Sequence, residues 1–275
     1  MTIYQITTHK PIGVFDSGMG GLTVLKALKA RLPQEGFIYL GDTARLPYGT
    51  KSPETVAQYA IQMTKILINR QIKALVVACN TATTAALPHL QTLFPDLPIL
   101  GVVQPSAAAV ICTTKNHKIA VLATETTIAS GAYQRLILET LPHAQITARA
   151  CSVLVALAEE GMINNAIAHA ALKHYLMDLH EQDTLLLGCT HFPVFKALLQ
   201  ELLPATMQIV DSAHATAAAL YTLLQSRDLF NPQIITGHTQ YLVTDFLKRF
   251  QAIGETFLGE PLLTNQIEVI DSCPH

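Results

Sequence analysis

Two short apolar runs that each end in a cysteine constrain the fold more than any other feature of this sequence. The first covers residues 74–78 and ends at Cys79, and the second covers residues 184–188 and ends at Cys189. Unbroken apolar runs of this length are typical of strands that are buried on both faces of a parallel sheet. Polar residues and a helix-forming segment follow each cysteine directly. Both thiols are therefore expected at the carboxyl edge of a sheet, where ligands bind in open α/β folds.

The pattern of strand, polar turn and helix occurs twice along the chain. Ile12 and Ile119 begin similar strands 107 positions apart, and Cys79 and Cys189 lie 110 positions apart. A nearly constant offset indicates an internal duplication. The predicted fold class is α/β, with two similar lobes that each hold a mainly parallel sheet flanked by helices. The lobes should be pseudo-symmetric, with the active site in the cleft between them. We expect residues 1–103 and 214–275 in the first lobe and residues 104–213 in the second.

Composition excludes several classes of partner. The chain has 275 residues, half of them hydrophobic and 14% charged, so it can bury a large core. The formal net charge is −2, which gives no electrostatic case for nucleic-acid binding. The first ten residues lack the basic start and apolar core of a signal peptide. No apolar run approaches the roughly 20 residues of a spanning helix. A soluble, cytoplasmic protein without a membrane or nucleic-acid partner is expected.

The five cysteines do not indicate a disulfide framework or a metal site. They are odd in number and widely spaced, and neither a C-x-x-C motif nor zinc-finger spacing occurs. Cys112, Cys151 and Cys273 are interpreted as small buried hydrophobes. Cys79 and Cys189 stand apart because both follow a predicted strand.

Two further segments contain candidate binding groups. Residues 17–21 read Ser-Gly-Met-Gly-Gly, after a strand that ends in Asp16. Free N–H groups at such a helix start favour an anion, and the missing third glycine and lysine argue against nucleotide motifs. We therefore predict a carboxylate-binding turn. In the loop at residues 42–49, spacing alone favours a packed aromatic for Tyr48 and a solvated cation for Arg45.

Two thiols that face each other across one cleft could serve three kinds of chemistry. A disulfide oxidoreductase usually has a C-x-x-C motif, and a metal site needs more soft ligands than two cysteines and His191. A cofactor-free racemase or epimerase needs an acid and a base on opposite faces of one carbon. Identical groups on both sides suit that reaction, because its reversal only exchanges their roles. A thiol with a pKa of about 8.5 must then be tuned by its neighbours, for which Asp16, a carboxylate of the second lobe and His191 are candidates.

Several motifs give the chain a specific resemblance. It resembles the glutamate racemases of the aspartate/glutamate racemase superfamily through residues 15–21 (FDSGMGG), 41–49 (GDTARLPYG), 77–82 (VACNTA), 188–193 (GCTHFP), 210–213 (VDSA) and 257–259 (FLG). The resemblance spans nearly the whole chain. It implies a two-base reaction between L- and D-glutamate without a metal or pyridoxal phosphate. It also implies a bacterial, cytoplasmic homodimer that supplies D-glutamate for peptidoglycan.

The resemblance also implies roles for particular residues. Cys79 and Cys189 would be the acid/base pair, tuned by Asp16 on one side and by Glu159 with His191 on the other. Glu160 is the adjacent alternative to Glu159. The substrate-binding residues would be Asp16, Ser17, Pro47, Tyr48, Gly49, Asn80, Thr81, Thr124, Thr127, Thr190 and His191. The competing functions are racemisation of another small amino acid such as aspartate, and amino-acid binding without catalysis.

Overall fold

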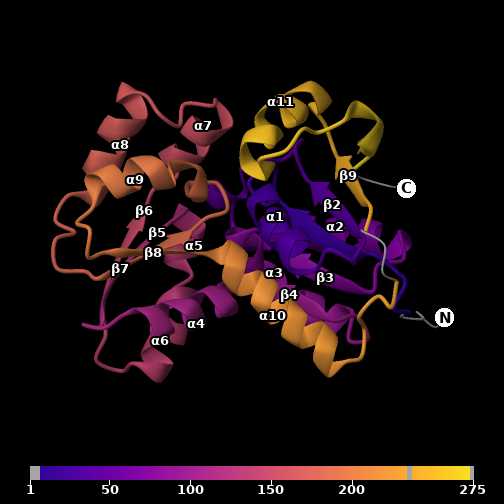
Figure 1. Ribbon diagram of the computed structural model, residues 1–275, viewed down its shortest axis with the longest axis horizontal. Coiled ribbons are helices and arrows are strands. Elements are labelled where there is room, and N and C mark those ends of the chain that lie inside the picture. Colours follow the sequence, from indigo (N-terminus) through magenta and orange to yellow (C-terminus); the bar gives the residue numbers. More distant parts are fainter. Residues whose placement is uncertain (1–6, 234–236, 273–275) are drawn as a thin grey trace.

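The computed structural model describes residues 7–233 and 237–272, and it contains two α/β lobes side by side (Figure 1). The first sheet has the strand order β10-β9-β2-β1-β3-β4, and the second has the order β6-β5-β7-β8. Every neighbouring pair of strands is parallel. The strands are β1 Ile12–Asp16, β2 Phe37–Gly41, β3 Ala74–Val77, β4 Ile99–Gly101, β5 Lys118–Ala123, β6 Gln145–Ala150, β7 Thr184–Gly188, β8 Gln208–Asp211, β9 Thr239–Val243 and β10 Ile267–Val269. The predicted fold class is confirmed.

The topology of the two sheets agrees with the predicted duplication. The order β2-β1-β3-β4 in the first sheet has its counterpart in β6-β5-β7-β8 of the second. Phe15, one residue before the end of β1, pairs with Val77 at the end of β3, and Ala123 at the end of β5 pairs with Gly188 at the end of β7. Both cysteine strands therefore lie beside the central strand of their sheet. The first sheet also contains β9 and β10, which come from the end of the chain.

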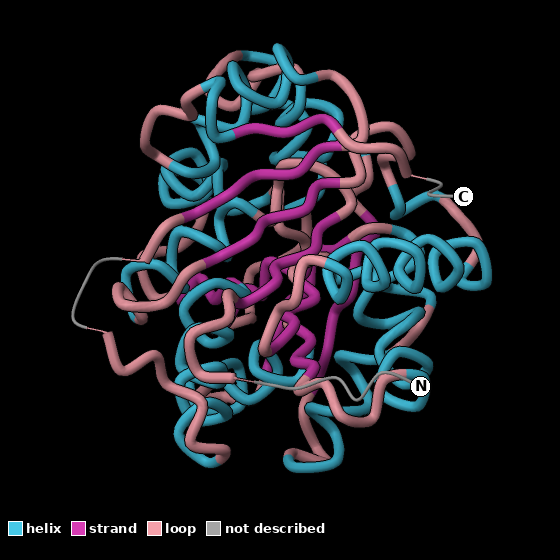
Figure 2. Tube along the Cα trace, turned by 90° about the vertical axis from the view of Figure 1, so that its right-hand side faces the viewer, coloured by secondary structure: helices cyan, strands magenta, loops and turns pink. Residues whose placement is uncertain are grey.

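Helices lie on both sides of the strands (Figure 2). The α-helices are α1 Leu22–Arg31, α2 Pro53–Asn69, α3 Asn80–Leu93, α4 Val103–Thr113, α5 Glu125–Ala129, α6 Ala132–Thr140, α7 Val153–Glu159, α8 Ala166–Leu176, α9 Lys196–Leu202, α10 Ser212–Ser226 and α11 Leu247–Leu258. Three short 3₁₀ helices are η1 Tyr48–Thr50, η2 Phe192–Phe195 and η3 Thr264–Gln266. The last helix, α11, ends at Leu258. Gly259 ends it in the left-handed conformation (φ 78°), which glycine adopts without strain.

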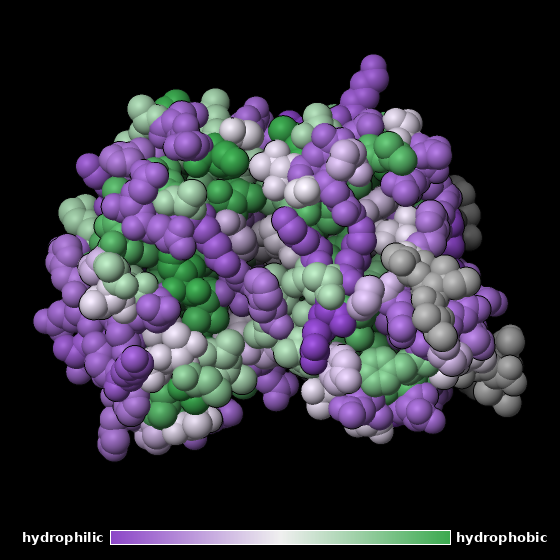
Figure 3. Space-filling view, viewed as in Figure 1, coloured by the Kyte–Doolittle hydropathy of each residue, from purple (hydrophilic) through white to green (hydrophobic). Residues whose placement is uncertain are grey.

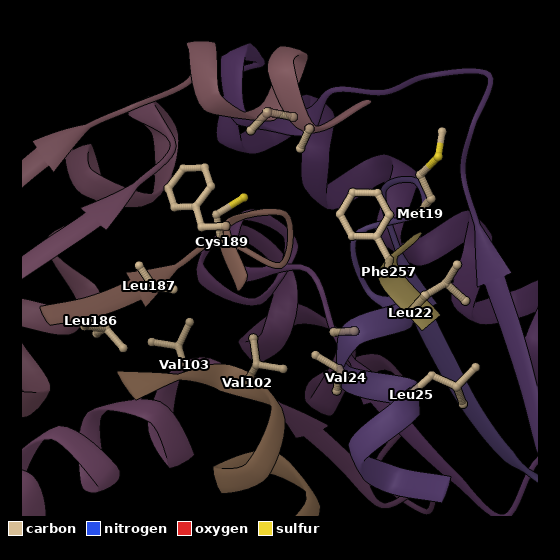
Figure 4. Packing of buried hydrophobic residues seen from close by; sticks show 14 of the residues in the cluster. Met19, Leu22, Val24, Leu25, Val102, Val103, Leu186, Leu187, Cys189 and Phe257 are labelled. Atoms are coloured by element: carbon tan, nitrogen blue, oxygen red, sulfur yellow. The ribbon is translucent and has the colours of Figure 1, made fainter. Parts of the chain in front are cut away.

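One hydrophobic core joins the two lobes. It contains α1 residues such as Leu25, residues 102 and 103 at the start of α4, and residues 186 and 187 of β7 (Figure 4). Helix α10 packs against both α1 and α4, and so it crosses from the second lobe to the first. A second core lies on the other face of the first sheet, beneath α2 and α3. The expected lobe limits at residues 103 and 213 fall between strands of different sheets, and as domain boundaries they stay a prediction.

A buried ion pair attaches the returning segment to the first lobe. Lys73 Nζ lies 2.5 Å from Glu35 Oε2, and both side chains are buried. The same ammonium donates to the carbonyl oxygens of Thr8 (2.7 Å) and Leu229 (2.8 Å). Burial lowers the pKa of Lys73, and Glu35 opposes that shift by stabilising the charge. The pair thus fixes the chain just after α10, where it returns to the first sheet.

The prediction for the three other cysteines is right for one of them and wrong for another. Cys151 is buried, and burial raises the pKa of its thiol to about 12. Cys112 is exposed, because the buried face of α4 includes Val103, Ala107 and Val110, and Cys112 projects from another face. Cys273 lies outside the described residues. Hydrophilic and apolar residues are interspersed over the face in Figure 3. No helix among residues 7–233 and 237–272 is long and apolar enough to cross a membrane.

Candidate active site

Both cysteines lie at the carboxyl edges of their sheets and line one small cavity between the lobes. Cys79 lies two residues after the end of β3 and caps α3, where its sulfur accepts from the amide of Ala82 (3.4 Å). Cys189 directly follows β7. The cavity is lined by Ser17, Pro47, Tyr48, Gly49, Cys79, Asn80, Thr81, Thr124, Val155, Glu159, Cys189, Thr190 and His191. The structure thus brings together most of the residues that the sequence singled out.

The cavity is nearly closed. Only about 20 Å³ is open to a water-sized sphere. A single water needs about 10–15 Å³ in this measure, whereas pockets for small ligands run to several hundred. A molecule larger than water can therefore reach the thiols only when the cavity walls, which come from both lobes, move apart.

The Cys79 side of the cavity favours a neutral thiol. Cys79 Sγ lies 3.5 Å from Ser17 Oγ, and both side chains are buried. Burial, together with the nearby carboxylate of Asp16, raises the pKa of Cys79 to about 12. A thiol in this environment holds a proton that it can deliver.

The Cys189 side has a chain of three residues. His191 Nδ1 lies 3.8 Å from Cys189 Sγ, and His191 Nε2 lies 3.0 Å from Glu159 Oε1. Burial lowers the pKa of His191, but its bonds to Cys189 and Glu159 outweigh this and raise it to about 10. A protonated ring can stabilise negative charge on the adjacent sulfur. The edge of the ring packs against Phe257 of α11 (centroids 5.4 Å apart), which helps to fix its orientation.

The structure distinguishes Glu159 from its neighbour Glu160. Glu159 is buried and lines the cavity, whereas Glu160 is exposed and pairs with Arg249 at 2.8 Å. Consecutive helical residues point about 100° apart, so one faces the cleft and the other faces solvent. The carboxylate next to His191 is therefore that of Glu159.

Asp16 corrects the prediction of a carboxylate-binding turn. Its own carboxylate accepts from the backbone amides of Gly18 (3.1 Å) and Gly21, the donors that the sequence offered to a ligand. Thr190 of the second lobe also donates to Asp16 Oδ1 (3.4 Å). Burial raises the pKa of Asp16, while the charge of His191 and these hydrogen bonds oppose the shift. Asp16 lies behind the cavity wall and acts on charge in the site from there.

Three threonine hydroxyls form a cluster across the lobe boundary. Thr81 Oγ1 lies 2.9 Å from Thr124 Oγ1 and 3.3 Å from Thr127 Oγ1, and the last two are 3.0 Å apart. Thr81 follows Cys79, while Thr124 and Thr127 belong to the second lobe. Thr127 is buried behind the cavity lining. Hydroxyls can donate or accept, so this cluster suits a carboxylate ligand.

Asn80 lines the cavity and has one buried donor that is unpaired in the described part of the chain. Its Oδ1 accepts from Tyr133 Oη (2.5 Å) and lies 3.4 Å from Ser212 Oγ. Its Nδ2 is buried, and no hydrogen-bond partner is found for it among the described residues. An unpaired buried donor costs free energy, which a bound acceptor would recover. Tyr133 and Ser212 were not singled out from the sequence, because neither stands next to a cysteine.

The loop at residues 42–49 is held from behind by a buried carboxylate. Asp42 accepts from the hydroxyl of Tyr48 and from Arg45 Nε (2.7 Å). The Arg45 guanidinium lies 4.1 Å from the ring centre of Tyr59. Arg45 is therefore not a solvated cation, as its spacing suggested, but part of the packing that supports the loop. Tyr48 is buried, in agreement with the sequence.

Comparisons with known proteins agree with this geometry. The profile of the Asp/Glu/hydantoin racemase family matches residues 15–220. The chain belongs to this family. It is 45% identical to the glutamate racemase of Syntrophus aciditrophicus (strain SB), over 92% of this chain and 94% of that one. Among solved structures, glutamate racemase isoform RacE1 from Bacillus anthracis superposes with a TM-score of 0.90 at 35% identity, covering 96% of this chain and 98% of that one. The enzyme from Francisella tularensis in complex with D-glutamate gives 0.88 at 34% identity over the same shares.

The site also contains residues that the sequence motifs did not identify. Val155 lines the cavity from α7, and Asp42 fixes Tyr48. An apolar side chain on a predicted helix carries no signal of its own, so Val155 could not be found from the sequence. No group of three or more His, Cys, Asp or Glu side chains that could hold a metal ion occurs in the part of the chain that the structure describes.

The tight contact between Gly49 and Thr124 predicts the effect of one mutation. A Cβ on Gly49 would lie 2.5 Å from Thr124 Cβ, a separation that real Cβ atoms do not show. Gly49→Ala should therefore hold the lobes apart and raise KM about tenfold, with little change in thermal stability. Steady-state kinetics and thermal unfolding would test this. Gly36→Ala is the matched control, because its Cβ would meet its nearest atom at an ordinary 3.5 Å. A normal KM in Gly49→Ala would contradict the close contact.

Proposed function

We propose that this chain is a glutamate racemase that interconverts L- and D-glutamate without a cofactor. The observation that carries the proposal is that two buried thiols, one from each lobe, line the same cavity. The relatives that resemble the chain over nearly their whole length are named glutamate racemases, which supports glutamate as the substrate. Inversion needs proton removal on one face of Cα and proton delivery on the other. Cys79 and Cys189 are the groups assigned to those two tasks.

The proposed reaction balances without an oxidant or a metal. One sulfur, as thiolate, takes the Cα proton, and the electron pair of the C–H bond passes into the substrate carboxylate. The opposite thiol then gives its proton to the other face of the planar carbon. Each cycle leaves the two sulfurs with exchanged protonation states, so the same site can run in either direction. Tuning of the thiols is assigned to Asp16 on the Cys79 side and to His191 with Glu159 on the Cys189 side.

Substrate binding is assigned to polar groups around the sulfurs. The free Asn80 amide, the hydroxyls of Ser17, Thr81, Thr124 and Thr190, and the loop at residues 47–49 supply donors for two carboxylates. Thr127 supports this set through its bonds to Thr81 and Thr124. A site with donors at several points of its wall can hold both ends of a dicarboxylic amino acid. We assign the product D-glutamate to peptidoglycan synthesis in a bacterial cytoplasm and expect a homodimer.

A deuterium experiment tests the proposal. Incubation with L-glutamate in deuterated water should produce D-glutamate, with one deuterium entering at Cα for each inversion. Circular dichroism follows the inversion, and mass spectrometry follows the label. L-aspartate in a parallel reaction tests the alternative of a different amino-acid substrate. Absence of exchange with every amino acid tried would leave the second alternative, a binding protein in which the cysteines only pack.

A further inference from the structure

We infer that Thr126 is a positioning residue that holds the substrate-binding loop closed over the cavity. Thr126 lies in α5 of the second lobe, between Thr124 and Thr127, but its hydroxyl takes no part in their cluster. Its Oγ1 lies 3.0 Å from the carbonyl oxygen of Gly49 and 3.0 Å from that of Lys51. One hydroxyl proton is thus shared between two carbonyls of the opposite lobe. The contact joins segments that are more than 70 residues apart in the chain.

The loop that Thr126 contacts forms part of the cavity wall. Gly49 and Tyr48 line the cavity, and η1 begins at Tyr48, so the loop that Thr126 holds is a wall of the site. The inner side of that wall is already in close contact with Thr124 through Gly49. A hollow of about 380 Å³ adjoins the end of this loop. It is lined by residues 50–53, by residues 84 and 85, and by residues 125, 126, 129 and 130 of the second lobe.

The two ends of the loop differ in how they are held. Asp42 holds its first part within the first lobe, through Arg45 and the hydroxyl of Tyr48. Its last part contacts the second lobe through the Thr126 hydroxyl, next to the open hollow. When the lobes separate to admit a ligand, the Thr126 bonds must break while the Asp42 bonds can persist. Thr126 therefore ties loop position to lobe closure.

The kinetic effects expected of Thr126 rest on the proposed racemase function, whereas its contact with the loop does not depend on that function. If closure precedes chemistry, weakening it raises KM and leaves the rate of the closed complex nearly unchanged. A neutral hydrogen bond contributes enough for a change of roughly 3- to 10-fold in an equilibrium. Thr126→Val keeps the shape and branching of the side chain but removes the hydroxyl. We expect it to raise KM for both enantiomers by roughly 3- to 10-fold with kcat within about twofold of wild type.

Two further variants separate positioning from general damage. Thr126→Ser retains the hydroxyl and should restore the wild-type KM. Thr92→Val is the matched control, since Thr92 Oγ1 donates to Pro88 O within its own helix, on the surface of the first lobe. Thr126→Ala replaces the valine variant if that protein does not fold, because alanine suits a helix and also lacks the hydroxyl.

Hydrogen exchange of backbone amides tests the contact without any substrate. In Thr126→Val, the amides of residues 48–51 should exchange several-fold faster than in wild type, while those in β1 and β3 should not change. If the wild-type protein does not racemise glutamate, the proposed function is wrong. The hydrogen-exchange result then tests the role of Thr126 by itself. Unchanged exchange at residues 48–51 together with an unchanged KM would overturn the inference. A fall in kcat with normal KM would also overturn it, because that result would place Thr126 in the chemical step.

Discussion

Replacing either Cys79 or Cys189 by serine is expected to lower kcat/KM for racemisation by about 10³- to 10⁴-fold. Serine retains the size of cysteine and its ability to donate a hydrogen bond, but its hydroxyl is a far weaker acid than a thiol. Because inversion uses one group on each face of Cα, loss of either group should stop the full reaction in both directions. Steady-state measurements from L- and from D-glutamate would determine both values.

The two cysteine variants should also differ from one another. Each keeps one sulfur, and that sulfur can remove the Cα proton from only one enantiomer. Any residual deuterium exchange without inversion is therefore expected with opposite enantiomers in Cys79→Ser and Cys189→Ser. Cys112→Ser is the control, because Cys112 is exposed and does not line the cavity. Wild-type turnover in either single variant would refute the assignment of two bases.

The second large effect is expected from the His191 and Glu159 pair. His191→Asn should lower kcat/KM by about 10²-fold, because it removes the protonated ring that lies next to Cys189. Glu159→Gln should lower kcat/KM less, and its main effect should be on the pH dependence of the rate. The pKa of His191 is raised to about 10 by Cys189 and Glu159 against the effect of burial, so without the carboxylate it should fall. The high-pH limb of the rate profile should then begin at a lower pH than in wild type.

The same groups predict the sign of a stability change. The pKa of His191 is higher in the folded protein than its ordinary value of 6.5. Its contribution to stability is therefore complete below about pH 6.5 and is lost as the pH rises through about 10. Glu159→Gln should flatten this loss, as measured by denaturant unfolding between pH 7 and pH 10. Glu160→Gln is the matched control, since Glu160 pairs with Arg249 on the surface. Identical pH profiles for both glutamine variants would exclude the role given to Glu159.

Each of the two cavity walls presents a cysteine sulfur, but the groups around the two sulfurs differ. The Cys79 wall combines a buried thiol with Ser17 and the negative charge of Asp16, which favours the protonated sulfur. The Cys189 wall contains a protonated histidine held by a carboxylate. In the closed cavity the first wall is thus poised to give a proton and the second to stabilise a negative sulfur. If the proposed reaction is correct, the rates from L- and from D-glutamate need not be equal.

Much of the architecture was predictable from local patterns in the sequence. Unbroken apolar runs predicted the buried strands β3 and β7, and the repeated strand-turn-helix pattern predicted two similar sheets. The position of each cysteine directly after its strand then placed both thiols at carboxyl edges. These features depend on neighbouring residues alone. For that reason they could be inferred before any contact between distant segments was known.

Only the tertiary structure decided how the walls of the site are built. The direction of α7 selects Glu159 over Glu160, and the donors of the glycine turn are taken by Asp16 rather than left for a ligand. The bonds of Thr126 to Gly49 and Lys51 depend on the packing of one lobe against the other. Strand order and sequence motifs contain no information on helix rotation or on lobe closure. The sequence therefore determined which groups meet in the cleft, while tertiary packing determined their partners and their charge.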